Sequence, residues 1–519
     1  MSIEKTVWAI APALMAAVLL WPLWSVALPA MTDYPAHVSA LYVQTHASDS
    51  ALARFYQTEW DFVPDLASEI LVPLFSIAVP FLTSVKLFVS LSLIMWVAAP
   101  FAIQYALYKR VGVSALAGAL FSYSAAFTWG FINFYFAAGA ALLLFAAWVA
   151  TEKHNGRLRI AVFALVAIAL LYAHALGIAL LAILLLFFEM VPARDGLRGS
   201  LLHRIGSATT VLLPAAVCFL FLRPAAADAH RFSFRILQSL DERAEAVMQN
   251  GFDSAAFVPL AVLALMVIAG IWTRRISIHP RMIAVLLALA VFCLFAPTMA
   301  GGGWGMHIRF PSIACLLLFA AMDVKLEDRL RPAIAAALVA LAVTNAATLL
   351  SSWRTNDRQY AEFRFALDQV PPGSRLFTVL DKAALKNSDT RVFRHMAEYA
   401  IMDRAAFVPL MFTTRGQHVV HTSAEYEPIA SLTSDQGHEA RLADLEDFAR
   451  GDFRADEDLT YLNRWPCNYD QVIVIHMGNP QSPVPALLRL KRAYSFFSLY
   501  EIVRPETCKS GFIEQVSAE

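Results

Sequence analysis

The sequence has little charge. Only 16% of its 519 residues are Asp, Glu, Lys or Arg and 58% are hydrophobic, whereas a soluble domain carries about 25% charged and about 45–50% apolar residues. The formal net charge is zero, so there is no basic excess to attract a polyanion, and we expect no nucleic acid partner. The apolar excess lies in repeated runs between residues 7 and 351, while residues 352–519 read as an ordinary soluble sequence.

The sequence also lacks the short motifs of soluble enzymes. It contains no HExxH and no CxxC, and the glycine-rich "GGGWG" at 301–305 is not followed by the Lys-Ser/Thr of a phosphate-binding loop. We therefore expect no metal site and no required cofactor, and leave a need for a divalent metal open.

Cys467 and Cys508 lie in the C-terminal region and pair in a disulfide if that region faces an oxidising compartment. Two unrelated thiols are the alternative.

The apolar runs are long enough to cross a membrane, which takes about 20 residues. The first run, Val7–Pro29, exceeds the apolar region of a signal peptide and ends in a poor cleavage site, so we expect it to be retained. Placing the Lys- and Arg-rich loops on the cytoplasmic side gives about eleven spans. They are residues 7–29, 84–107, 112–128, 133–150, 158–173, 175–191, 205–222, 256–273, 282–299, 307–322 and 333–351.

This topology predicts a polytopic α-helical protein of the inner (plasma) membrane with a cytoplasmic N-terminus. Its transmembrane domain, residues 1–351, carries outer loops at 30–83 and 223–255, and residues 352–519 form an extracytoplasmic domain. That domain reads as α/β or α+β. Its pattern predicts a helix, a turn and a strand over 357–381, a strand at 470–478, a helix at 483–492 and a strand at 494–504. We find no catalytic constellation in it.

Two helices are predicted between the first two spans. "PAHVSALYVQTHA" places Val38, Leu41 and Tyr42 on one stripe, which is typical of an interfacial amphipathic helix. The segment 64–80 is interrupted by Pro73 and is too short to span, so we expect it to lie along or dip into the outer leaflet.

The predicted topology collects polar side chains at the outer face of the membrane. Charged groups at membrane depth are costly and usually functional, although loops are also polar for ordinary reasons. The candidates are Asp33, His37, Glu69, Lys86, Asn133, His174, Arg231, His307 and Arg309.

The order of these elements resembles the GT-C superfamily of integral-membrane glycosyltransferases, which use polyprenyl-phosphate-linked sugars. The resemblance rests on "TDYPAH" in the first outer loop, the two helices after it, "RPAAADAHRFSFR" after the seventh span and "HIRFPSIACLLLFAAM" at a late span. It covers the topology of residues 1–351. It implies that Asp33 is the essential acid and that the loop with Arg231 helps bind the lipid phosphate. Many members carry two adjacent acids where this chain has Asp33-Tyr34.

The chemistry of such a donor assigns roles to the candidates. The leaving phosphate needs cationic stabilisation rather than a general acid, which Arg309, His307, Arg231 and Lys86 can supply. The acceptor hydroxyl needs a base, for which Asp33 is the best candidate. The candidate supporting residues are His37, Glu69, Asn133 and His174.

Other interpretations remain open at this point. An Asp two residues before Pro35 is also typical of a helix start, so Asp33 is either a cap or a base. A transporter or flippase of a lipid-linked sugar would place polar groups at mid-membrane and show an internal repeat. A membrane O-acyltransferase would use a histidine with an asparagine, here His174 with Asn133. For a glycosyltransferase the partners are the polyprenyl-phosphate sugar, a lipid, glycan or protein acceptor, and membrane lipids.

Overall fold

The chain divides into two compact units in this computed structural model. The first comprises residues 1–25, 62–71 and 83–351, and the second comprises residues 26–61, 72–82 and 352–519. Residues 26–61, which follow the first apolar run, thus belong to the same unit as the C-terminal region. The structure describes residues 3–154, 156–192, 200–222, 267–268, 270–300, 303–385, 388–430, 440–450, 457–476, 478 and 483–508.

The first unit is helical. In the described part of the chain, five helices are long and apolar enough to cross a membrane: Phe81–Tyr108, Ile132–Ala150, Gly156–Ala173, Leu201–Phe221 and Arg331–Gln369. Its helices are α1 (Ile3–Ser25), α5 (Phe81–Tyr108), α6 (Val113–Ala119), α7 (Ala125–Trp129), α8 (Ile132–Ala150), α9 (Gly156–Ala173), α10 (Ala175–Met190), α11 (Leu201–Leu222), α14 (Pro280–Phe295), α15 (Met306–Arg309), α16 (Pro311–Ala320) and the first part of α17 (Arg331–Ala366).

Two of the predicted spans are wrong as continuous helices. The run at 112–128 divides into α6, a 3₁₀ turn and α7, because the Ser124 side chain accepts a hydrogen bond from the Phe127 amide and starts a new helix there. The run at 307–322 divides into α15 and α16, because Pro311 begins the second helix. The span predicted at 256–273 lies largely outside the described residues.

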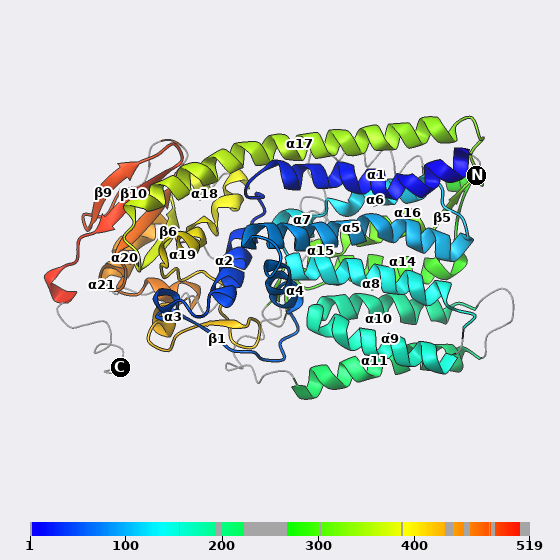
Figure 1. Cartoon of the computed structure of the whole chain (residues 1–519), viewed down its shortest axis with the longest axis horizontal. Helices are drawn as coiled ribbons and strands as arrows, with labels where there is room; N and C mark the ends of the chain where they lie inside the picture. The colour runs from blue at the N-terminus through cyan, green and yellow to red at the C-terminus, as the bar shows by residue number, and fades with distance from the viewer. Residues whose placement is uncertain are drawn as a thin grey trace. The chain divides into compact units, whose positions relative to one another are not determined.

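Small residues let the helices of the first unit approach closely. A Cβ atom on Gly177 of α10 would lie 2.6 Å from Ala137 Cβ of α8, and one on Gly139 would lie 2.9 Å from Met95 Cβ of α5. Contacts of this kind replace hydrophobic burial as the basis of helix association in a bilayer. Helices α8, α9, α10 and α11 consequently run side by side (Figure 1).

A buried ion pair joins α14 to α10. Arg281 is 4% exposed and Glu189 3% exposed, and Arg281 Nη2 lies 2.9 Å from Glu189 Oε2. Trp148 Nε1 donates to the other oxygen of Glu189 at 2.9 Å, and Arg281 Nη1 also reaches Glu152 Oε1 at 2.6 Å. The charges therefore satisfy one another, which is the condition for burying them.

The second unit is built around a four-stranded sheet with strand order β6-β8-β10-β9. Strands β6 (Leu376–Leu380) and β8 (Gln471–Ile475) are parallel and wholly buried, and β10 (Phe497–Ile502) runs antiparallel to β8 and to the edge strand β9 (Leu488–Ala493). The sheet agrees with the predicted C-terminal α/β or α+β region. The helix predicted at 483–492 is wrong, because pairing with β10 makes its second half a strand.

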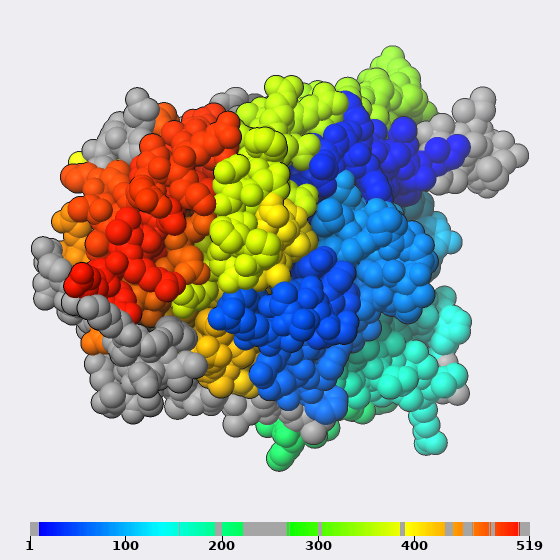
Figure 2. All heavy atoms as spheres, turned by 60° about the vertical axis from the view of Figure 1, so that its left-hand side comes forward, coloured from blue at the N-terminus to red at the C-terminus, as the bar shows by residue number. Residues whose placement is uncertain are grey.

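The helix that follows the first apolar run is part of the second unit. Helix α2 (Tyr34–Thr45) packs against α19 (Tyr399–Arg404), and eight of its 12 residues are buried. The sequence predicts an interfacial amphipathic helix here, and the burial contradicts that prediction. Strand β1 (Tyr56–Thr58) pairs antiparallel with β7 (Val420–Thr422), so two distant segments share one core. Figure 2 shows the blue atoms of the first segment against the yellow atoms of the second.

Helix α4 (Ala67–Ser76) is short and contains Pro73, as expected for a segment that does not span. Its Ile70 and Leu74 are more than half exposed, and Ile77 just beyond it is 82% exposed. These three residues recur at helical spacing, so they form one apolar exposed face.

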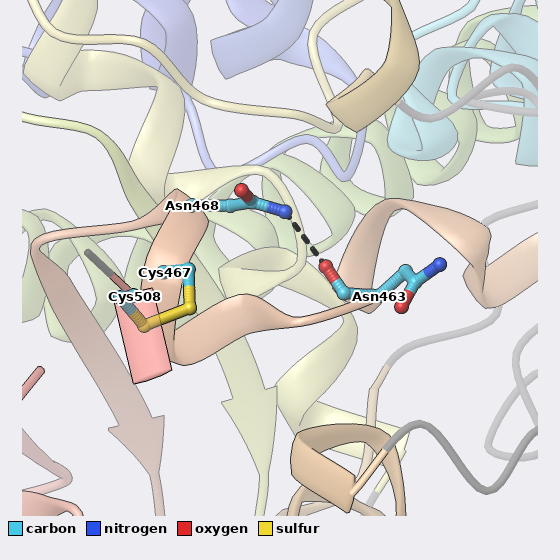
Figure 3. Close-up of a disulfide and its surroundings, with 4 residues drawn as sticks. All are labelled: Asn463, Cys467, Asn468 and Cys508. Atoms are coloured by element: carbon cyan, nitrogen blue, oxygen red, sulfur yellow. Dashed lines mark hydrogen bonds between the residues drawn. A yellow bond between two sulfur atoms is a disulfide. The ribbon is translucent and has the colours of Figure 1, made fainter. Parts of the chain in front are cut away.

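A disulfide joins Cys467 to Cys508, the pair predicted from sequence, with the Cα atoms 5.4 Å apart (Figure 3). Cys467 lies in α21 (Trp465–Asn468), just before β8, and Cys508 ends the 3₁₀ turn Glu506–Cys508 after β10. Asn468 Nδ2 donates to the Asn463 carbonyl at 2.7 Å and braces the same turn. The bond therefore closes a loop that contains β8, β9 and β10.

Candidate functional site

Asp33 stands at the start of helix α2, where the sequence places it. Its carbonyl accepts a hydrogen bond from the His37 amide at 3.1 Å, and Pro35 occupies the first turn. Its carboxylate, however, makes no capping bond to the described backbone of that helix. Asp49, by contrast, caps α3 (Ser50–Ala53) by accepting from the Ala51 amide at 2.9 Å. Asp33 thus has the position of a cap without a cap's side-chain bond.

The Asp33 carboxylate faces a buried histidine. His395 Nε2 lies 3.8 Å from Asp33 Oδ1, and His395 Nδ1 lies 2.8 Å from Glu398 Oε1. The side chain of His395 is 2% exposed, that of Glu398 is 0% exposed and that of Asp33 is 14% exposed. We call this arrangement of carboxylate, imidazole and carboxylate the Asp33 row. All three residues belong to the second unit.

Local structure explains how two members of the row come together. His395 precedes the 3₁₀ turn Met396–Glu398, which leads directly into α19. Side chains three residues apart in such a turn lie above one another, so His395 and Glu398 meet on one face. Ser39 Oγ of α2 donates to the Glu398 carbonyl at 2.8 Å. This bond ties the turn to the helix that Asp33 begins.

The surroundings of His395 favour its charged form. Burial alone would lower the pKa of His395, but the charge and hydrogen bond of Glu398, together with the charge of Asp33, outweigh burial and the repulsion of Arg394. The pKa of His395 is therefore raised.

One aromatic ring borders the row. Phe412 lies edge-on to His395, with ring centroids 5.2 Å apart, and stacks on His418 at 5.4 Å. His37, a predicted supporting residue for Asp33, packs edge-on against the same ring at 5.0 Å and is 9% exposed. The imidazole rings of His37, His395 and His418 thus all contact Phe412. Asp33 is the one member of the row that is partly exposed.

Other predicted residues meet in the first unit at the N-terminal end of α8. Asn133 Nδ2 donates to Glu69 Oε2 at 2.9 Å, and Asn133 Oδ1 accepts from the Ser68 amide at 2.7 Å. Ser68 Oγ also donates to Glu69 Oε2 at 2.9 Å. Glu69 is 8% exposed, so its carboxylate is buried with at least two hydrogen bonds.

Arg309 and His174 meet beside the same helix end. Arg309 Nη1 lies 3.4 Å from His174 Nε2, and Arg309 Nη2 donates to the Trp304 carbonyl at 2.8 Å. The guanidinium carbon sits 3.9 Å from the ring centroid of Phe131 and 5.2 Å from that of Phe134. Aromatic faces and hydrogen bonds fix the cation in place. We call Glu69, Asn133, His174 and Arg309 the α8 cluster.

The remaining candidates are placed differently. His307 is 7% exposed and packs edge-on against Trp304, at 5.9 Å between centroids, two residues before Arg309 in α15. Lys86 of α5 lies over the ring of Trp24, at 5.8 Å, rather than in the α8 cluster. Arg231 lies outside the described residues.

Sequence reasoning missed His395 and Glu398. None of the predicted catalytic or phosphate-binding residues lies in 352–519, whereas that region supplies two of the three members of the Asp33 row. The only signal in the sequence is the spacing of a His and a Glu three residues apart in "RHMAE".

The described residues contain no group of three or more His, Cys, Asp or Glu side chains arranged to hold a metal ion. The Asp33 row holds a carboxylate in the second unit. The α8 cluster, considered by itself, holds a guanidinium fixed by hydrogen bonds and aromatic rings in the first unit. No protein-family model, curated protein or solved structure matches this chain.

Proposed function

We propose that the chain is a membrane glycosyltransferase that moves a sugar from a polyprenyl-phosphate donor to an acceptor hydroxyl, with Asp33 as the general base. The observation that carries this proposal is the state of the Asp33 carboxylate. A carboxylate that serves as a cap accepts a backbone N–H of its helix, and Asp33 instead faces His395 at 3.8 Å with its side chain 14% exposed. A base requires a carboxylate that a substrate can reach, and Asp33 is the partly exposed member of the row.

The proposed reaction has one bond-forming and one bond-breaking event. The acceptor hydroxyl gives its proton to Asp33 while its oxygen attacks the anomeric carbon of the sugar. The bond between that carbon and the phosphate oxygen breaks, and its electron pair leaves with the lipid phosphate. Because this phosphate is already a stable anion, it needs cations and N–H donors rather than a proton.

Arg309 supports the phosphate side of the proposal. Its guanidinium is 8% exposed and is held by the Trp304 carbonyl and the Phe131 ring. A cation that only anchored its helix to lipid headgroups would extend toward the interface, whereas Arg309 is enclosed by aromatic side chains. A guanidinium that is fixed before the ligand arrives stabilises developing charge without reorganisation.

We also propose the finer topology of about eleven spans, with a cytoplasmic N-terminus and an extracytoplasmic C-terminal region. The basic loops support it, as does the disulfide between Cys467 and Cys508, since disulfides persist in oxidising compartments. The exposed apolar face of Ile70, Leu74 and Ile77 supports a position of α4 in the outer leaflet.

The test compares wild type, Asp33→Asn and Asp49→Asn in sugar transfer from a panel of polyprenyl-phosphate sugars, with Tm and donor affinity recorded in parallel. Losing a general base costs about 10²–10⁴-fold in rate, so Asp33→Asn should lose transfer while it stays folded at the assay temperature and its donor affinity stays unchanged. Asp49→Asn is the matched control, because Asp49 begins a helix in the same unit and caps it. Near-normal turnover by Asp33→Asn would refute the proposal.

Lipid analysis of a deletion strain separates the reaction classes. A missing transferase should leave its lipid-linked sugar accumulated at the outer face, and this lipid then becomes the donor for the assay. A missing flippase should leave the lipid at the cytoplasmic face. A missing O-acyltransferase should leave the lipid-linked sugars unchanged and an acyl group absent from the acceptor.

A further inference from the structure

We propose that His395, held by Glu398, is the positioning residue for Asp33: it acts as an imidazolium that keeps the Asp33 carboxylate ionised and aimed. The catalytic meaning of this pairing rests on the proposed function, whereas the charge pairing itself does not. The proposal assigns to residues 352–519 a part in the site that begins at Asp33.

The two ring nitrogens of His395 face different groups. Nδ1 lies 2.8 Å from Glu398 Oε1 and Nε2 lies 3.8 Å from Asp33 Oδ1, so each nitrogen faces a different carboxylate. A neutral imidazole has one N–H donor, and only the imidazolium has two. Nδ1 is within hydrogen-bond distance of Glu398, whereas the 3.8 Å contact of Nε2 with Asp33 is one of charge. The imidazolium is the form that supplies a charge to both acids of the row.

Burial of Glu398 points the same way. Its side chain is 0% exposed, and its Oε2 has no hydrogen-bond partner among the described residues. A buried carboxylate is costly unless a cation accompanies it, and His395 is the group in hydrogen-bond contact with it. The buried Glu398 carboxyl thus shares with Asp33 the imidazole of His395.

The other titratable groups near His395 do not replace this pairing. Arg394, its neighbour in the chain, opposes the positive charge. His37 of α2 and His418 both contact the ring of Phe412, which also contacts His395. Asp33 and Glu398 are therefore the two anionic groups that act on the imidazole.

The pairing predicts a defined pH effect on transfer. An opposite charge within about 4–6 Å shifts a titration by about 1–3 pH units. In His395→Gln, which keeps N–H donors and removes the charge, the acidic limb of the pH–rate profile should therefore move up by about 1–3 pH units. The matched control is His476→Gln, because His476 is also 2% exposed, lies in the same unit and bonds Ser498. Its acidic limb should stay in place.

A second measurement needs no substrate. We would measure Tm across pH for wild type, Asp33→Asn, His395→Gln and the double variant in detergent. In the pH range where Asp33 is ionised and His395 is protonated, the Tm losses of the two single variants should together exceed the loss of the double variant. This excess should vanish as the pH rises and the imidazole deprotonates. Glu398→Gln should lower the pH at which this excess in Tm loss vanishes. If His395→Gln does not fold, the Glu398→Gln variant tests the charge pairing in its place.

The outcomes separate the two proposals. Non-additive Tm losses in a protein without transferase activity would support the charge pairing and refute the proposed function. Additive losses at every pH would overturn the pairing, and so would an unmoved acidic limb in an active His395→Gln protein.

Discussion

Replacing both members of the disulfide, Cys467→Ser with Cys508→Ser, removes a constraint on the unfolded chain. The two residues are 41 positions apart. In the chain-entropy treatment a closed loop of that size stabilises by about 4 kcal/mol at 25 °C, between the values for loops of about 15 and 100 residues. The closed loop contains β8, β9 and β10, so the loss should fall on the sheet of the second unit.

Hydrogen exchange of the full-length protein in detergent is the suitable assay, because it reports on each unit separately. Peptides from β8 and β10 should exchange up to about 1,000-fold faster in the double variant, since each 1.4 kcal/mol is a factor of about ten. Reduced wild type should behave like the variant. Cys218→Ser, which alters a free thiol of α11, should leave both strands unchanged. Exchange within about threefold of wild type would refute the assigned magnitude.

Three further predictions follow from other contacts. Glu189→Gln breaks a buried ion pair with Arg281 and should cost about 3–5 kcal/mol, seen as a lower Tm than that of the more exposed Glu152→Gln. Ala405 ends α19 with φ 48°, so Ala405→Gly should stabilise by about 0.5–1 kcal/mol in chemical denaturation; a lower midpoint would contradict this. Burial would raise the pKa of Asp470, but hydrogen bonds and charge from Arg375 lower it overall. The ionised Asp470 therefore stabilises the fold above the unfolded pKa of about 3.9, and this stabilisation is lost as the pH falls through the pKa of Asp470 in the folded protein. On acidification, the Tm of Asp470→Asn should therefore fall less than the Tm of wild type.

Continuous apolar composition made the long helices predictable. The runs at 84–107, 133–150 and 158–173 agree closely with α5, α8 and α9 because length and hydropathy alone decide them. The edge strand β9 was not predictable in this way. Its segment "LLRLKR" carries basic and leucine residues at a spacing that also suits a helix, and only pairing with β10 selects the strand.

The candidate site shows the same division between local and long-range information. Asp33 was predictable because an acid before Pro35 at the end of an apolar run is a local pattern. Its partner His395 was not, because the contact joins the first outer segment to the C-terminal region, across a sequence separation that no local pattern encodes. The side chains of the α8 cluster were predictable as a group, whereas their pairing depends on how α8, α10 and α15 pack.

The packing of α2 indicates the structural role of residues 352–519. A lid would cover a site that is already complete in the transmembrane region. Helix α2, however, buries eight of its 12 residues in the second unit, and Ser39 bonds the Glu398 carbonyl there. The backbone that carries Asp33 is therefore folded against the C-terminal region, and the direction of its carboxylate depends on that packing. Under the proposed function, the C-terminal region is a structural part of the catalytic base's surroundings rather than an accessory that closes over them.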